Sequence, residues 1–107
     1  MKSTADFTQA LRGNARVVVD CSAEWCGPCK AISPVFQRLS ELPDLKHVVH
    51  FAKFDVDAVP ELARDLDVRA MPTFLFFKGG ERFDELVGAD PTHLKDRVTK
   101  LATAFIK

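Results

Sequence analysis

The segment from Arg16 to Ser22 constrains the fold of this chain more than any other part of the sequence. It contains Val17-Val18-Val19, a nearly continuous apolar run that is typical of a strand buried on both faces. Such a strand needs helices on both sides of its sheet, and a helical pattern follows it directly. The apolar positions of that pattern are Ile32, Val35, Phe36, Leu39 and Leu42. Pro34 lies inside the pattern, so we expect the helix to kink there and continue.

Further helices and strands flank this unit. A first helix is expected from the helical face formed by Phe7, Ala10 and Leu11, with Ser3 and Asp6 as its cap. His47–Val56 is rich in Val and Phe and predicts a second strand. A short helix then begins at Pro60, and its apolar positions are Leu62, Ala63 and Leu66.

The last third of the chain predicts a hairpin and a closing helix. Thr73–Lys78 and Glu81–Val87 are expected to pair antiparallel around a Gly79-Gly80 turn. Asp90 and Pro91 begin the closing helix. Its expected inner face consists of Leu94, Val98, Leu101, Ala102 and Phe105. We therefore predict an α/β fold with a central mixed sheet flanked by helices on both faces.

Size and charge restrict the functional class. The 107 residues predict a single domain, residues 1–107. Lys plus Arg and Asp plus Glu each number 15, a balance that does not favour nucleic acid or anionic lipid as a partner. The densest apolar run, Thr73–Phe77, is too short to span a membrane, and residues 1–6 lack the apolar core of a signal peptide. We expect a cytoplasmic protein, or an organellar one if a transit peptide has been removed.

Two of the three cysteines lie three residues apart in Trp25-Cys26-Gly27-Pro28-Cys29, between the first strand and the kinked helix. Side chains at i and i+3 meet on one side of a helical turn, so the two thiols can form a local disulfide. Cys26 is expected at the helix N-terminus, where free N–H groups and the helix dipole favour a thiolate. Cys29, one turn further on, is expected to be more buried and less acidic. This asymmetry suits an attacking and a resolving thiol.

Other uses of the cysteine pair fit the sequence less well. A structural zinc site requires four ligands, and no second C-x-x-C or H-x₃-H motif is present, so no metal is expected. Haem attachment needs a His after Cys29, where Lys30 stands. A structural disulfide that closes so short a loop constrains the unfolded chain little. Redox chemistry is the favoured interpretation.

Several segments resemble the thioredoxin family, and together they cover nearly the whole chain. They are Val17-Val18-Val19-Asp20, Ala23-Glu24-Trp25-Cys26-Gly27-Pro28-Cys29-Lys30, Arg69-Ala70-Met71-Pro72-Thr73-Phe74, Phe77-Lys78-Gly79-Gly80 and Val87-Gly88-Ala89. The resemblance implies a thioredoxin fold and reduction of protein disulfides. It also implies that Asp20 lies beneath Cys29 and helps to move its proton, with Lys53 as the partner of that carboxylate. A carboxylate inside an apolar strand is costly unless it is paired or functional.

The resemblance also implies a substrate-binding rim around the reactive sulfur. Pro72 is expected to follow a cis peptide bond that faces the cysteines, and the extended backbone at Met71 can pair with a substrate chain. Gly88, without a side chain, allows a partner backbone to approach closely. The full set of expected rim residues is Trp25, Gly27, Pro28, Val56, Met71, Pro72, Val87, Gly88 and Ala89.

The sequence departs from the family pattern at two places. Cys21 stands where relatives usually carry an aromatic residue, and we interpret it as a small buried hydrophobe, with a regulatory thiol as the alternative. Residues 1–5 are polar and lack a β-branched run, so the first strand of the family is expected to be absent or vestigial. The strand at His47–Val56 would then be an open edge, available to a second molecule. The chain is expected to be a monomer or a homodimer formed through that edge.

These features predict a thiol–disulfide oxidoreductase that needs no bound cofactor. The resemblance implies that NADPH supplies electrons through a thioredoxin reductase, and that disulfide-containing proteins are the substrates. A disulfide isomerase or oxidase is one alternative, although Gly27-Pro28 replaces the Gly-His that is typical of isomerases. A binding or chaperone-like module, in which the cysteines are incidental, is the other. His47, His50 and His93 are expected to be solvated or half-buried. The charged residues Arg64, Asp65, Asp67 and Arg69 are expected to form a solvated helix face and loop.

Overall fold

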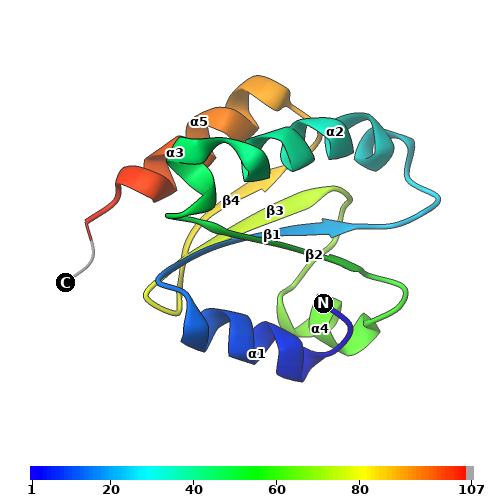
Figure 1. Cartoon of the computed structure of the whole chain (residues 1–107). Helices are drawn as coiled ribbons and strands as arrows, with labels where there is room; N and C mark the ends of the chain where they lie inside the picture. The colour runs from blue at the N-terminus through cyan, green and yellow to red at the C-terminus, as the bar shows by residue number, and fades with distance from the viewer. Residues whose placement is uncertain (106–107) are drawn as a thin grey trace.

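A four-stranded mixed sheet forms the centre of the structure, a computed structural model that describes residues 1–105 (Figure 1). The strand order is β2-β1-β3-β4, with β1 at Arg16–Ser22, β2 at His50–Asp55, β3 at Thr73–Lys78 and β4 at Glu81–Val87. β1 runs parallel to β2 and antiparallel to β3, and β3 pairs antiparallel with β4. The predicted mixed sheet is therefore confirmed.

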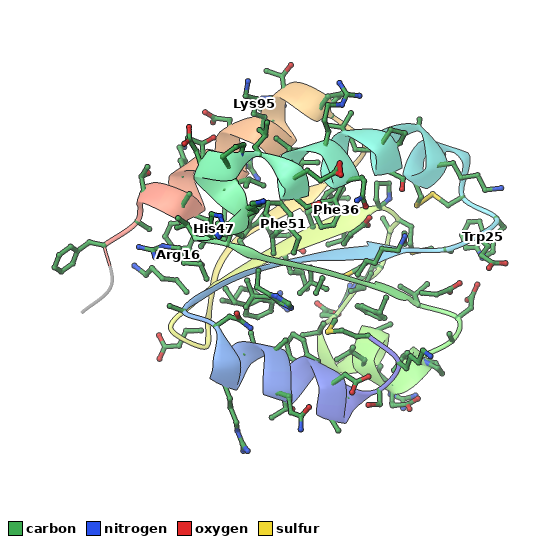
Figure 2. The ribbon with its side chains drawn as sticks, in the orientation of Figure 1. Arg16, Trp25, Phe36, His47, Phe51 and Lys95 are labelled. Atoms are coloured by element: carbon green, nitrogen blue, oxygen red, sulfur yellow. A yellow bond between two sulfur atoms is a disulfide. The ribbon has the colours of Figure 1, made fainter. Side chains whose placement is uncertain are left out.

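Helices cover both faces of the sheet, as the apolar run in β1 predicts. In Figure 1, α2 (Gly27–Glu41) and α5 (Pro91–Thr103) lie on one face, whereas α1 (Thr4–Gly13) and α4 (Pro60–Asp65) lie on the other. Val18 packs into the core beneath α2 and α5, and its neighbours Val17 and Val19 pack into the core beneath α1 and α4. In the first core the Phe36 ring contacts that of Phe51 with 5.4 Å between centroids (Figure 2).

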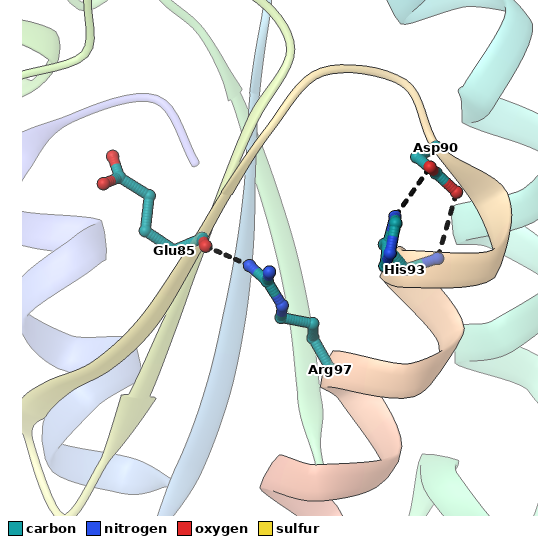
Figure 3. Close-up of polar contacts among 4 residues, drawn as sticks. All are labelled: Glu85, Asp90, His93 and Arg97. Atoms are coloured by element: carbon teal, nitrogen blue, oxygen red, sulfur yellow. Dashed lines mark hydrogen bonds and ion pairs between the residues drawn. The ribbon is translucent and has the colours of Figure 1, made fainter.

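Each long helix begins at a residue whose side chain accepts a backbone N–H, which satisfies a donor that the helix itself leaves free. At α1 the Ser3 hydroxyl accepts from the amide of Asp6 at 3.1 Å, as predicted. At α5 the Asp90 carboxylate accepts from the amide of His93 at 3.1 Å (Figure 3). Arg97, one turn further on, donates to the carbonyl of Glu85 and so fixes α5 against β4 (Figure 3). α2 continues through Pro34, as predicted.

The turn between β3 and β4 depends on its two glycines. Gly79 and Gly80 have φ values of 60° and 83°, the left-handed region that a tight two-residue hairpin requires. The register then shifts between Phe76 and Phe77, so that Phe83 has no partner opposite it. This bulge leaves the Phe83 ring partly exposed at the surface of the hairpin.

Three boundary predictions are wrong. The second strand begins at His50 rather than His47, because Pro43 starts an extra four-residue helix, α3 (Pro43–Lys46), and the amide of Val49 bonds back to the carbonyl of Leu45 at 2.8 Å. The predicted helical pattern includes Leu42, but α2 ends at Glu41, and Leu42 is 39% exposed between α2 and α3. Phe105 is 81% exposed because α5 ends at Thr103.

The sheet has an open edge at β2. Among residues 1–105 no strand precedes α1, which confirms the predicted departure from the family pattern. The amino group of Met1 donates to the carbonyl of Lys53 at 2.7 Å, a contact at the position that a further strand would occupy. In the same described part of the chain, no helix is both long enough and apolar enough to cross a membrane.

Candidate redox site

Cys26 and Cys29 form a disulfide at the point where β1 leads into α2. Their Cα atoms are 5.3 Å apart, within the ordinary range for a disulfide. Ala23 is buried against the pair, and Val56 and Met71 pack around it half-buried. The two sulfur atoms thus lie in a small apolar cluster at the carboxyl end of β1, as the sequence predicts.

The two cysteines differ in position rather than in burial. Each is 4% exposed, so the expectation that Cys29 is more buried is wrong, because Ala23, Val56 and Met71 cover both. Cys26 is the N-cap of α2, and its sulfur accepts the amide N–H of Cys29 at 3.1 Å. The same sulfur lies 3.6 Å from the carbonyl oxygen of Met71. Cys26 therefore receives the electrostatic support of the helix terminus, which Cys29 does not.

Asp20 is a buried carboxyl group beneath this site. It is 3% exposed, and burial raises its pKa from 3.8 to about 6, with an opposing attraction from Lys53. Its Oδ1 atom has no hydrogen-bond partner among residues 1–105. Lys53 lies opposite Asp20 in the β1–β2 register, but its side chain is exposed and makes no ion pair with Asp20 in that part of the chain. The lysine acts on the carboxyl group only through space.

A cleft of about 450 Å³ connects Asp20 and Cys29 with the surface beside β2. Both residues line it, together with Lys53 from β2 and with Lys30 and Ser33 from α2. The carboxyl group is thus buried among side chains and yet lies at the end of a path open to solvent. Such a path allows a buried acid to exchange its proton during a reaction cycle.

The predicted cis peptide bond precedes Pro72 and is confirmed. Pro72 is buried, and its carbonyl accepts the amide of Gly88 at 2.9 Å, which joins the two loops of the rim. Gly88 has a φ of 107°, whereas a Cβ at this position meets no atom within 4 Å. The backbone conformation, rather than crowding within the chain, therefore requires glycine here. Val87 is 57% exposed, and Ala89 is also exposed.

Trp25 projects from the loop before α2, at the opposite end of the molecule from Arg16 and His47 (Figure 2). Its side chain is 68% exposed, and Nε1 donates to the Asp57 carboxylate at 2.7 Å. The sequence did not identify Asp57. A signal was present, because Asp57 follows β2, and the carboxyl ends of two adjacent parallel strands lie at one edge of a sheet.

The other residues singled out in the sequence lie either at the surface or in the core. Gly27 and Pro28 are exposed in the first turn of α2, beside the cysteines. Cys21 is a free thiol that is fully buried in the core beneath α1 and α4, and burial raises its pKa strongly. Its interpretation as a small hydrophobe is confirmed. The histidines are exposed as predicted, and residues 1–105 contain no cluster of three or more His, Cys, Asp or Glu that could hold a metal.

Comparison with known proteins places this site in a family. The family model described as thioredoxin matches residues 1–100. The chain belongs to the thioredoxin family. It is 58% identical over 83 residues to Thioredoxin Asp f 29 of Aspergillus fumigatus, and the aligned region covers 78% of this chain and 74% of that protein. It is 45% identical over 100 residues to the thioredoxin of Malassezia sympodialis, which covers 94% of each.

Solved thioredoxin structures share the fold. The crystal structure of Malassezia sympodialis thioredoxin superimposes with a TM-score of 0.91 at 44% identity, over 96% of this chain and 89% of that one. The oxidized mitochondrial thioredoxin 3 of Saccharomyces cerevisiae superimposes with a TM-score of 0.87 at 35% identity, over 94% of this chain and 92% of that one. Family membership together with the Cys26–Cys29 pair makes this chain a thiol–disulfide oxidoreductase with protein-disulfide reductase activity. The isomerase and binding-module alternatives are not favoured.

Proposed function

We propose that residues 1–107 form one thioredoxin domain in which Cys26 attacks the substrate and Cys29 resolves the intermediate. The observation that carries this assignment is the hydrogen bond from the Cys29 amide to the Cys26 sulfur at the N-terminus of α2. A thiolate at Cys26 accepts this N–H and is stabilised by the helix dipole. Cys29, within the helix, is close enough to attack Cys26 without any rearrangement of the fold.

The reaction proceeds in two exchanges. The Cys26 thiolate attacks one sulfur of the substrate disulfide, which forms a mixed disulfide and releases the other substrate sulfur as a thiolate. Cys29 loses its proton and attacks the Cys26 sulfur, which forms the Cys26–Cys29 disulfide and releases the second substrate thiolate. The two substrate thiolates take up protons. The substrate gains two electrons and the protein loses two.

In this scheme Asp20 accepts the proton of Cys29, assisted by the charge of Lys53. A carboxyl group with a pKa of about 6 is a base near neutral pH that still holds a proton transiently. The shared cleft supports this role, since it places both groups on one path to solvent. Replacement of Asp20 by Asn tests the role, because it removes the base and leaves the shape of the side chain almost unchanged.

The substrate chain binds along the rim. We propose that its backbone pairs with Met71 ahead of the cis Pro72, so that its sulfur lies over Cys26, which is 3.6 Å from the Met71 carbonyl. A cleft of about 430 Å³ continues from Met71 and Val56 along α4 and provides apolar contact. The other residues of the proposed contact surface are Trp25, Gly27, Pro28, Val87, Gly88 and Ala89.

The cycle needs a supply of electrons. We propose that a thioredoxin reductase using NADPH returns the Cys26–Cys29 disulfide to the dithiol, so that the protein serves electron transport without a bound cofactor. Turbidity that follows insulin reduction, in the presence of NADPH and a thioredoxin reductase, tests this function. Turbidity at a rate proportional to protein concentration is expected. No turbidity above that of the reductase alone contradicts the proposal.

We also propose that the protein works in the cytoplasm as a monomer. The six-residue edge strand β2 carries an exposed lysine, Lys53, and the backbone carbonyl of Lys53 accepts a hydrogen bond from the Met1 amino group. Both features oppose edge-to-edge pairing. Sedimentation across a wide concentration range tests the assembly. A monomeric mass throughout is expected, whereas a dimer that Lys53→Glu alters identifies the β2 edge as its interface.

A further inference from the structure

Ser33 lies on the wall of the cleft that reaches the redox pair. It follows Cys29 by one turn of α2, and residues at i and i+4 lie on the same side of a helix. Its side chain is half-buried and lines the cleft together with Asp20 and Cys29. No motif and no step of the proposed reaction uses this hydroxyl.

The Ser33 hydroxyl also differs from the other hydroxyls that lie beyond the first turn of a long helix. Serine and threonine inside a helix ordinarily donate to a carbonyl one turn earlier. Thr8, Thr99 and Thr103 donate to the carbonyls of the residues four positions before them, and Ser40 donates to that of Gln37 at 2.6 Å. Ser33 makes no such bond within residues 1–105, and Asp20 Oδ1 is the one buried side-chain oxygen there without a partner.

We propose that Ser33 is a positioning residue for proton transfer at Asp20. Its hydroxyl holds a water molecule in the cleft that bridges to the Asp20 carboxyl group and passes the proton to solvent. A bridging water needs a polar site with two or more partners and enough room, and the cleft of about 450 Å³ provides both. The inference rests on the proposed role of Asp20 as the base for Cys29.

The charged groups of the residues that line the cleft with Asp20 cannot replace the hydroxyl. They are Lys53 and Asp55 from β2, Lys30 from α2, Glu24 from the preceding loop, and Lys2 with the Met1 amino group from the N-terminal segment. An ammonium group donates hydrogen bonds but accepts none, and a carboxylate accepts them but donates none, whereas a hydroxyl does both. Ser33 is therefore suited to orient a water that takes a proton from one side and releases it on the other.

The proton balance is simple. Cys29 gives its proton to the Asp20 carboxylate as its sulfur attacks Cys26 and breaks the mixed disulfide. Protonated Asp20 then gives that proton to the bridging water, which releases one to solvent in the cleft. Asp20 returns to the carboxylate and no net proton stays in the protein.

Single-turnover kinetics test the proposal. The reduced protein is mixed with a disulfide substrate, and the resolving step is followed by the fluorescence of Trp25 from pH 5 to pH 8. Ser33→Ala is expected to slow this step by roughly fivefold, because a bridged hydrogen bond to a charged group is lost. Its pH inflection is expected to rise by roughly half a unit, because the carboxylate loses a donor. Alanine favours a helix more than serine does, so the variant folds.

Three further variants separate this role from a structural one. Ser33→Thr keeps a hydroxyl and is expected to restore most of the rate, and Ser40→Ala is expected to leave the rate and the inflection unchanged. In an Asp20→Asn background, Ser33→Ala is expected to have no further effect. Two outcomes overturn the inference about Ser33 and leave the role of Asp20 intact. One is an equal slowing by Ser33→Ala in both backgrounds. The other is no slowing by Ser33→Ala although Asp20→Asn slows the step. If Asp20→Asn itself has no effect, the proposed base and this inference both fail.

Discussion

The N-termini of α2 and α5 have almost the same geometry and very different chemistry. Each cap residue has an extended backbone, each is followed by a proline in the first turn, and each side chain accepts the amide N–H three residues further on at 3.1 Å. At α2 the accepting atom is the sulfur of Cys26, and at α5 it is an oxygen of Asp90. The local structure therefore does not decide which of the two is reactive.

The cap atom and its surroundings decide it together. Cys26 is buried in an apolar cluster beside a second thiol, with the titratable Asp20 at the end of a nearby cleft. The Asp90 side chain is 47% exposed, and its bonds to the backbone and the side chain of His93 lower its pKa (Figure 3). A helix terminus thus supplies a stabilised anion at both places. At α2 the accepting atom is a sulfur beside a second cysteine, so it can take part in thiol–disulfide exchange, which a carboxylate cannot.

The largest expected effect follows from replacement of the cap atom at α2. Cys26→Ser is expected to lower disulfide reduction by roughly a thousandfold or more, because a thiolate nucleophile is lost. Serine is a favourable N-cap, so the melting temperature of the reduced protein is expected to change little. Insulin reduction and thermal denaturation measure the two quantities. Residual activity near that of the wild type contradicts the role of Cys26.

The second effect concerns the buried carboxyl group that α5 lacks. Asp20→Asn is expected to slow the resolving step by about tenfold to a hundredfold. It is also expected to stabilise the protein at pH 7 by roughly 1–3 kcal/mol, because the charged form is disfavoured in the folded state. The measurements are single-turnover kinetics and denaturant unfolding.

The pH dependence of that stabilisation follows from the raised pKa. Between pH 3.8 and about 6 the folded Asp20 keeps a proton that the unfolded chain has lost, so the wild type loses stability as the pH rises through this window. The advantage of Asp20→Asn should therefore be complete above pH 6 and should vanish near pH 4. A difference that is independent of pH contradicts the assignment.

The third effect tests the structural cap. Asp90→Ala is expected to lower the melting temperature by about 5 °C, because α5 loses the acceptor for the His93 amide. Disulfide reduction at 25 °C is expected to stay near that of the wild type. A loss of activity as large as that of Asp20→Asn, in folded protein, would mean that α5 does more than support the rim.

The smallest effect concerns the side-chain contact of Asp90 with His93, 2.7 Å long and exposed. The pKa of Asp90 lies below its ordinary value, so this carboxylate stabilises the fold above pH 3.8 and the contribution is lost as the pH falls further. The difference in melting temperature between the wild type and Asp90→Asn should shrink between pH 5 and pH 2. His93→Ala keeps the hydrogen bond from the backbone amide, so its melting temperature at pH 5 should lie between those of the wild type and Asp90→Asn.

Local patterns in the sequence predicted much of the fold and the centre of the site. The bounds of β1, β3 and β4, the start of α5 and the position of Cys26 depend on neighbouring residues, so they can be read along the chain. The four-residue helix α3 was not predicted, because a single helical turn is too short to show a periodic pattern. Its start at Pro43 was the one available signal.

Contacts between distant segments were harder to predict. The equal burial of Cys26 and Cys29 depends on Val56 and Met71, which reach the pair from other parts of the chain. The hydrogen bond from Trp25 to Asp57 likewise joins residues in the loops that follow two different strands, β1 and β2. The free hydroxyl of Ser33 is apparent only once its missing helical bond and its place in the cleft are known. Tertiary structure, rather than local propensity, fixes these features.

The central claim is that Cys26 attacks and Cys29 resolves, and trapping of the mixed disulfide tests it most directly. Reduced Cys29→Ser protein is incubated with a disulfide substrate, and the products are separated without reductant and mapped by mass spectrometry. A stable mixed disulfide is expected at Cys26 in this variant, and none is expected at Cys29 in the matched Cys26→Ser variant. Trapping at Cys29 with none at Cys26 would contradict the account.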